Sequence, residues 1–178
     1  MQGNNKVLIA ADEDGKRLVV LPQVIFEGKR SISWNDVEQY LLRYVGDIVR
    51  VAETEDLVYI GRDFADEYSH SKYTEKLRGG LAKTKANMVQ GIHGMIEIAG
   101  NRRWNEDFEK RHGKKAENGW YRYDTRFAMP IMNEKGEIIR YNVYLAVLIV
   151  RYASNNKLYL YDIQNIKKET SIPSRTDL

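Results

Sequence analysis

The chain has 178 residues, of which 43% are hydrophobic and 30% are charged, so it is long enough to bury a core and its composition does not indicate disorder. Its 28 basic and 25 acidic residues leave a net charge of +3, which is too small to indicate nucleic-acid binding over the whole surface. The absence of cysteine excludes disulfides and thiolate metal sites.

The apolar stretches of the sequence are short. The N-terminal segment MQGNNKVLIAADEDGKRL returns to charged residues too soon for a signal peptide, and no run approaches the roughly 18 apolar residues that span a bilayer. The sequence therefore predicts a soluble, cytoplasmic protein without a membrane partner.

The first third of the chain predicts two hairpins and a helix. Asp14-Gly15 lies between two apolar runs, and residues 53–56 separate two further strand-like runs. Between the hairpins, apolar residues at helical spacing follow Ser33, a candidate N-cap, and end at Gly46. Residues 65–80 are polar and irregular, so we expect them to connect an annex (1–65) to a second domain (66–178), with one compact unit as the alternative.

The second part predicts one long helix and a sheet. Apolar residues recur every three or four positions from Leu81 to Ala99, and Gly91 and Gly94 within this segment indicate close packing or a weak point. Residues 105–119 are charged and predict a short helix and a loop. Three strand-like segments at 120–132, 138–152 and 157–166 then predict an antiparallel meander. The predicted fold class is α+β, with the long helix packed on the C-terminal sheet.

The segment GWYRYDTRFAMP suggests a function for this sheet. With alternating side chains, its tyrosines and Phe127 share one face, and Arg122 and Arg126 share the other, about 13 Å apart. We expect the first face, extended by Val143 and Leu145, to receive the long helix. The second face, the arginine face, is predicted to bind phosphate and to stack bases through its remaining members, Trp120, Asn142 and Tyr144. The alternative is a solvated face on which Asp124 pairs with an arginine.

Other candidate residues lie outside the arginine face. His112, in the basic segment KRHGKK, is a candidate general acid or base, or alternatively a solvated loop residue. Lys72, close to His70, and Lys167 and Thr170 in the last strand suit a phosphate, although a polar linker and a charged terminus would have the same composition. His93 is predicted to have a packing or surface role. No phosphate loop, metal motif or carboxylate cluster is present in the sequence, so we expect no metal and no cofactor.

Four segments resemble one family. SKYTEKLRGGLAKTKANMVQGIHGMIEIAGN, RHGKKAENGWYRYDTRFAMP, YNVYLAVLIVR and KLYLYDIQNIKKETS are similar in order and pattern to the large polyvalent protein-associated domains of phages and conjugative elements. These domains are assigned to the barnase, EndoU, colicin and RelE-like nuclease fold. The resemblance covers residues 70–171 and leaves residues 1–65 outside it.

The resemblance implies metal-independent RNA cleavage by a toxin-like protein of a mobile element, with an immunity protein or a larger assembly as partner. It implies that His112 is the base or acid and that Arg122, Arg126 and Lys72 bind phosphate. Tyr144 and Thr170 would orient the phosphate or donate protons. Catalytic residues vary in this superfamily, and none is matched residue by residue. The alternative is a non-catalytic module of the same fold that binds nucleic acid or, through its twelve tyrosines, protein.

Overall fold

The computed structural model describes residues 6–28, 31–105 and 118–173. These residues form a mixed α+β fold, in agreement with the predicted class. Its elements are β1 (Leu8–Ala11), β2 (Arg17–Val20), α1 (Trp34–Leu41), the 3₁₀ turn η1 (Leu42–Tyr44), β3 (Ile48–Arg50), β4 (Leu57–Tyr59), α2 (Asp63–His70), α3 (Lys72–Lys76), α4 (Gly79–Asn87), the 3₁₀ turn η2 (Met88–Gly91), α5 (Ile92–Glu97), β5 (Gly100–Asn105), β6 (Trp120–Met132), β7 (Ile138–Tyr152) and β8 (Leu158–Pro173).

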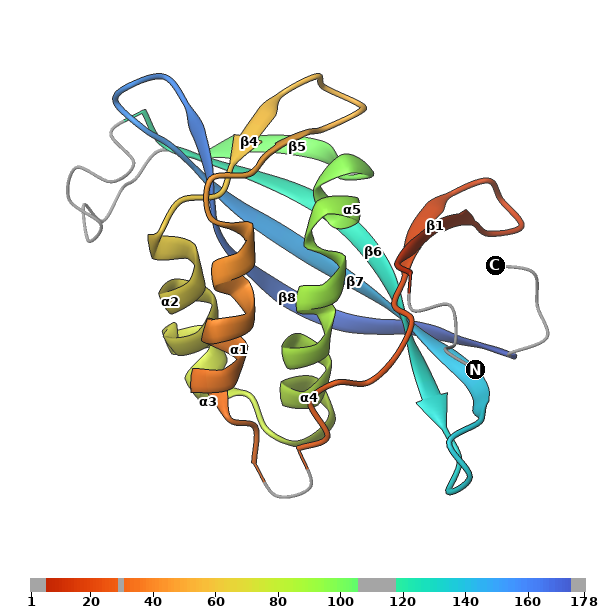
Figure 1. Cartoon of the computed structure of the whole chain (residues 1–178). Helices are drawn as coiled ribbons and strands as arrows, with labels where there is room; N and C mark the ends of the chain where they lie inside the picture. The colour runs from red at the N-terminus through yellow and green to blue at the C-terminus, as the bar shows by residue number, and fades with distance from the viewer. Residues whose placement is uncertain (1–5, 29–30, 106–117, 174–178) are drawn as a thin grey trace.

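The described strands form one eight-stranded sheet in the order β1-β2-β6-β7-β8-β4-β3, with β5 also paired to β6. Strands β6, β7 and β8 form the predicted antiparallel meander, and the two N-terminal hairpins extend it through the parallel pairs β2–β6 and β4–β8. The helices lie on one face of this strongly twisted sheet (Figure 1). The division at residue 65 stays a prediction, and the sheet pairing crosses it. None of the helices in the described ranges combines the length and apolar character needed to cross a membrane.

The first third of the chain has the predicted order of hairpin, helix and hairpin. The expectation of an irregular connector at residues 65–80 is wrong, because α2 and α3 occupy most of it. Phe64, Ala65 and Tyr68 are buried against the core, and these positions lie on one side of α2. The first of them, Phe64, precedes the polar segment that was expected to be a connector.

The predicted long helix consists of three consecutive pieces, α4, η2 and α5, with the interruption ending at Gly91. Its glycines allow β2 to approach closely. A Cβ atom on Gly91 would lie 2.9 Å from Val19 Cγ1, and one on Gly94 would lie 3.0 Å from Val19 Cγ2. The segment therefore has both properties that the two glycines indicated, close packing and a break in the α-helical geometry.

The predicted inner face is correct for β6 and wrong for β7. Tyr123 and Phe127 are buried in the main core beneath the helices, as expected. Val143 and Leu145 instead lie opposite Ala128 and Arg126, on the other face of the sheet. The cause is a one-residue register shift beside the β6–β7 turn, between Ile131 and Met132. Such a bulge moves every later side chain of the partner strand to the opposite face.

Candidate functional site

Arg126 is held in an ion-pair network on the helix-free face of the sheet. Its guanidinium lies 3.1 Å from Asp12 Oδ2 and contacts both carboxylate oxygens of Glu169, with Nη2 2.9 Å from Oε1 and Nε 3.1 Å from Oε2. The Arg126 side chain is 13% exposed. Two carboxylates therefore already balance its charge, which argues against the predicted role in binding phosphate.

The rest of the arginine face is also bonded within the chain. Arg122 Nε lies 3.2 Å from the side-chain amide of Asn105. Asp124 pairs with Arg103 of β5 at 2.9 Å, so this carboxylate does pair with an arginine, but with neither Arg122 nor Arg126. Trp120 is 8% exposed, and its ring packs edge-on against Tyr161 with the ring centroids 5.0 Å apart.

Two predicted members of the arginine face belong to the opposite face. Tyr144 pairs with Phe127 in the sheet register and stacks on its ring with centroids 5.4 Å apart, beneath the helices. Asn142 pairs with Met129, and its Oδ1 accepts a hydrogen bond of 2.9 Å from Ser171. The expectation that Asn142 and Tyr144 share a face with the arginines is wrong, because of the register shift described above.

The remaining predicted residues that the structure describes lie on two separate elements, and only those of β8 share the helix-free face with Arg126. Lys167 and Thr170 are exposed on β8, opposite Leu145 and Val143. Lys72 is exposed at the start of α3, in the helical layer on the other side of the sheet from the arginines. His112 lies outside the described residues. The described members of the predicted catalytic set therefore do not form one constellation.

A different set of polar side chains surrounds a groove along the edge strand β3. The groove has a volume of about 560 Å³ and is lined by Ile48, Val49, Arg50, Ala52, His93 and Glu97. Its lining includes one histidine, one glutamate and one arginine among apolar residues. Concave sites with a few convergent polar groups are the usual location of ligand binding and catalysis. We call it the His93 groove.

His93 is oriented by two contacts. Its Nε2 lies 2.8 Å from Asp47 Oδ2, and its ring packs against Tyr44 with centroids 5.3 Å apart. Burial raises the pKa of Tyr44, so its hydroxyl stays protonated and donates a hydrogen bond of 2.6 Å to the Val89 carbonyl. The His93 side chain remains 53% exposed. The imidazole is thus fixed on one side and open to solvent on the other.

The chain turn at Gly46 positions Asp47. Gly46 has φ +93°, a left-handed conformation that favours glycine, and it directs the chain from η1 into β3. The Asp47 amide donates to the Tyr44 carbonyl, and the Asp47 carbonyl accepts from the Ile60 amide, each at 3.0 Å. The sequence predicted the helix end at Gly46 but gave no signal for the contact between Asp47 and His93, which are 46 positions apart.

Glu97 and Arg50 complete the polar lining. Glu97 follows His93 by four positions on α5, so the two side chains are neighbours on one side of the helix. Arg50 pairs with Glu55, and the two side chains are 60% and 71% exposed. An ion pair as exposed as this one contributes roughly 0–1 kcal/mol to the free energy of unfolding. Arg50 can therefore release Glu55 and bind an anionic ligand with little loss of stability.

Two tyrosines adjoin the groove on the helix-free face of the sheet. Ile48, which lines the groove, pairs with Tyr59 in the sheet, and the Tyr59 ring lies 5.8 Å from that of Tyr159. Lys157 Nζ lies 5.0 Å from the centroid of the Tyr59 ring. These three side chains form what we call the tyrosine patch, which offers aromatic surface beside a cation.

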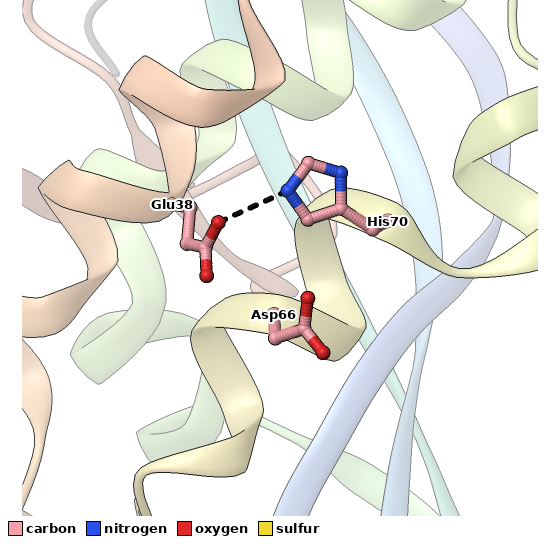
Figure 2. Close-up of side chains that lie close together, drawn as sticks. All are labelled: Glu38, Asp66 and His70. Carbon is pink, nitrogen blue, oxygen red and sulfur yellow. Dashed lines mark hydrogen bonds and ion pairs between the residues drawn. The ribbon is translucent and has the colours of Figure 1, made fainter.

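A set of candidate metal ligands lies elsewhere in the helical layer. Glu38 of α1 and Asp66 and His70 of α2 place their ligand atoms within 4.8 Å of one another (Figure 2). The sequence predicted no metal site because Glu38 and His70 are 32 positions apart and neither belongs to a recognisable motif. The packing of α1 on α2 brings them together.

Comparison with known proteins adds no relative. No protein-family model, no curated protein and no solved structure matches the chain. The roles of these residues are therefore inferred from the geometry and chemistry of the chain itself.

Proposed function

We propose that this protein cleaves RNA by metal-independent acid–base transesterification in the His93 groove. One observation carries the proposal: an imidazole that is hydrogen-bonded to a carboxylate shares a groove with a second carboxylate and an arginine. The nuclease-like resemblance of residues 70–171 supports the same reaction class. The acid–base residues proposed here differ from those inferred from the sequence, since His93 takes the place of His112.

RNA suits this residue set because it carries its own nucleophile. Glu97 would accept the proton of a ribose 2′-hydroxyl as that oxygen attacks the adjacent phosphorus. The bond from phosphorus to the 5′-oxygen would then break, with His93 donating a proton to the leaving oxygen, and a 2′,3′-cyclic phosphate and a 5′-hydroxyl would result. Positioned acids and bases of this kind typically contribute about 10²- to 10⁴-fold each to the rate.

Asp47 and Arg50 would support this reaction without exchanging protons with the substrate. The Asp47 carboxylate orients the imidazole and balances its charge when the ring carries a proton. Arg50 can bind the phosphate and stabilise the negative charge that develops on its oxygens.

The tyrosine patch supports a single-stranded substrate. Base stacking on aromatic side chains is tolerant of sequence and contributes about 1–3 kcal/mol for each base. Tyr59 lies next to the groove through its pairing with Ile48. A strand with a phosphate at Arg50 could therefore place a neighbouring base on Tyr59.

The test is incubation of the purified protein with a single-stranded RNA of mixed sequence in EDTA, followed by analysis of the new ends. We expect fragments with 2′,3′-cyclic phosphates, and no cleavage of DNA of the same sequence. His93→Ala, Glu97→Gln and Asp47→Asn should each reduce the rate by about tenfold or more. Glu75→Gln, which removes an exposed carboxylate of α3 away from the groove, is the matched control and should retain full activity.

Other outcomes would overturn the assignment. If His112→Ala lost activity while His93→Ala kept it, the acid–base role would return to His112, the residue predicted from the sequence. Binding of RNA without any cleavage by the wild-type protein would favour the non-catalytic nucleic-acid-binding module.

A further inference from the structure

Glu38, Asp66 and His70 converge from two helices on one point of the surface. His70 Nε2 and Glu38 Oε1 are 3.0 Å apart, and Figure 2 shows one oxygen of the Asp66 carboxylate directed toward the His70 ring. Asp66 and His70 are four positions apart on α2, which places both on one side of that helix. Glu38 is contributed by α1, which packs directly on α2. This acid–histidine cluster does not include any residue of the His93 groove.

The spacing of the ligand atoms suits a small divalent cation. Zn²⁺ binds histidine nitrogen and carboxylate oxygen at about 2.0–2.2 Å, which places neighbouring ligand atoms of a tetrahedral site about 3.3 Å apart. The separation of 3.0 Å between His70 and Glu38 is close to this value, and all three ligand atoms lie within 4.8 Å of one another. Small rotations of the side chains would therefore complete a site with three protein ligands and an open position for water.

The charge around the cluster also favours a cation. Helices α1 and α2 carry five acidic residues, Asp36, Glu38, Asp63, Asp66 and Glu67, against two basic residues that flank α2, Arg62 and Lys72. His70 is the last residue of α2, where the helix dipole places partial negative charge. His70 Nε2 faces Glu38 Oε1, and a metal ion bound between these two atoms would replace their direct contact.

We propose that Glu38, Asp66 and His70 bind a divalent transition-metal ion of the Zn²⁺ type and thereby link α1 to α2. The proposal does not depend on RNA cleavage, since that reaction is assigned to a separate groove and to metal-free chemistry. Binding of an ion to the folded chain alone would stabilise it by mass action.

The experiment is titration of the metal-free full chain with Zn²⁺ by calorimetry, together with thermal unfolding. We expect one equivalent to bind and the melting temperature to rise by about 2 °C or more in excess Zn²⁺. Titration with Co²⁺ should give visible absorption bands of a low-coordinate site. Glu38→Gln and His70→Ala should each weaken binding at least tenfold and abolish the rise in melting temperature.

Asp63→Asn is the matched control, because it removes an exposed carboxylate from the same helix without touching the cluster. It should change the affinity for Zn²⁺ less than threefold. An equal loss in Asp63→Asn and Glu38→Gln would show diffuse attraction to an acidic surface and overturn the proposal. So would the absence of binding at 0.1 mM Zn²⁺. Circular dichroism of each variant would show whether it keeps the wild-type fold, and Glu38→Gln preserves the shape of the side chain it replaces.

Discussion

Lys85 of α4 and Asp162 of β8 form an ion pair in which both side chains are completely buried, with Lys85 Nζ 2.7 Å from Asp162 Oδ1. Thr74 accepts a second hydrogen bond from Lys85, and the Tyr68 ring lies 4.4 Å from its ammonium. Burial lowers the pKa of Lys85, and the nearby Asp162 carboxylate opposes this shift. Because both side chains are completely buried and join α4 to β8, we interpret the pair as a structural link between the helical layer and the sheet.

Removal of one partner should be costly. Lys85→Met would leave the Asp162 carboxylate buried without its counter-ion, and we expect the free energy of unfolding to fall by about 3–5 kcal/mol. The double variant Lys85→Met/Asp162→Leu should recover part of this loss, since an apolar pair of similar volume needs no desolvation of charge. Urea denaturation of the three proteins measures both effects. A single variant as stable as the wild type would show that the pair is not buried as described.

A second network, centred on the partly buried Asp56, predicts the response to acid. Burial alone would raise the pKa of Asp56, but hydrogen bonds from Tyr123 and Thr54 and the ion pair with Arg102 hold it below its usual value of 3.8. A lowered carboxylate pKa stabilises the fold fully above the unfolded value and loses this contribution as pH falls through the folded value. Asp56→Asn should therefore cost about 1.5–3 kcal/mol at pH 7.

The difference in unfolding free energy between wild type and Asp56→Asn should narrow as the pH is lowered from about 5 to about 2. Chemical denaturation at a series of pH values measures this directly. A difference that stays constant over the whole range would contradict the lowered pKa.

The close approach of β2 to the η2–α5 segment predicts that alanine in place of Gly91 destabilises the fold, whereas alanine in place of the unobstructed Gly80 stabilises it. Gly91→Ala would place a Cβ atom 2.9 Å from Val19 and 3.0 Å from Leu21, and we expect this overpacking to cost about 1–3 kcal/mol. Gly80→Ala, in α4, meets no atom within 4 Å and should stabilise the chain by up to about 1 kcal/mol. Thermal unfolding of the two variants measures the change in stability caused by each substitution. Equal changes would mean that helix propensity, and not packing against β2, determines the effect at both positions.

Local patterns predicted the hairpins, the meander and the inner face of β6, because each depends on residues that are neighbours in sequence. The pairing register of β7 with β6 could not be predicted. It depends on a one-residue shift beside the turn between these strands, and the residues of this turn are compatible with more than one register. Helix α2 was missed for a different reason. Its buried positions begin at Phe64, before the polar segment that was read as a connector.

The candidate site was less predictable than the fold. His93 was expected to have a packing or surface role, and its local sequence contains no sign of Asp47, which follows a different helix. The alternating pattern of β6 predicts an exposed Arg126 that is free to bind phosphate. Its two carboxylate partners, however, come from residues 12 and 169, at the two ends of the described chain. Long-range ion pairs of this kind carry no signal in a single sequence.

These ion pairs give a prediction that separates Arg126 from an exposed arginine. Arg126→Ala would leave Asp12 and Glu169 without their shared cation, and we expect a loss of about 1–2 kcal/mol in unfolding free energy with no change in affinity for RNA. Arg140→Ala, at an exposed position of β7, should stay within about 0.5 kcal/mol of the wild type. A weaker affinity for RNA in Arg126→Ala, without loss of stability, would restore the phosphate-binding role predicted from the sequence.

The tyrosine patch gives the last prediction. If Lys157 and Tyr59 contact single-stranded RNA, Lys157→Ala should weaken binding by tenfold or more, since hydrogen bonds to charged groups contribute about 1.5–3 kcal/mol. It should also reduce the slope of log affinity against log salt by about 0.7, because one fewer cation neutralises the strand. Tyr59→Ala should weaken binding by a similar amount but leave the salt slope unchanged, because stacking releases no counterions.

Lys135→Ala provides the control for this measurement. Lys135 is exposed in the turn between β6 and β7, at the other end of β7 from Lys157, so it carries the same charge away from the patch. Fluorescence anisotropy with a short labelled RNA at several salt concentrations compares the three variants. Equal losses in Lys135→Ala and Lys157→Ala would show that RNA is attracted by charge over the whole surface. A loss confined to Lys157→Ala and Tyr59→Ala would place the strand beside the His93 groove, where the proposed cleavage requires it.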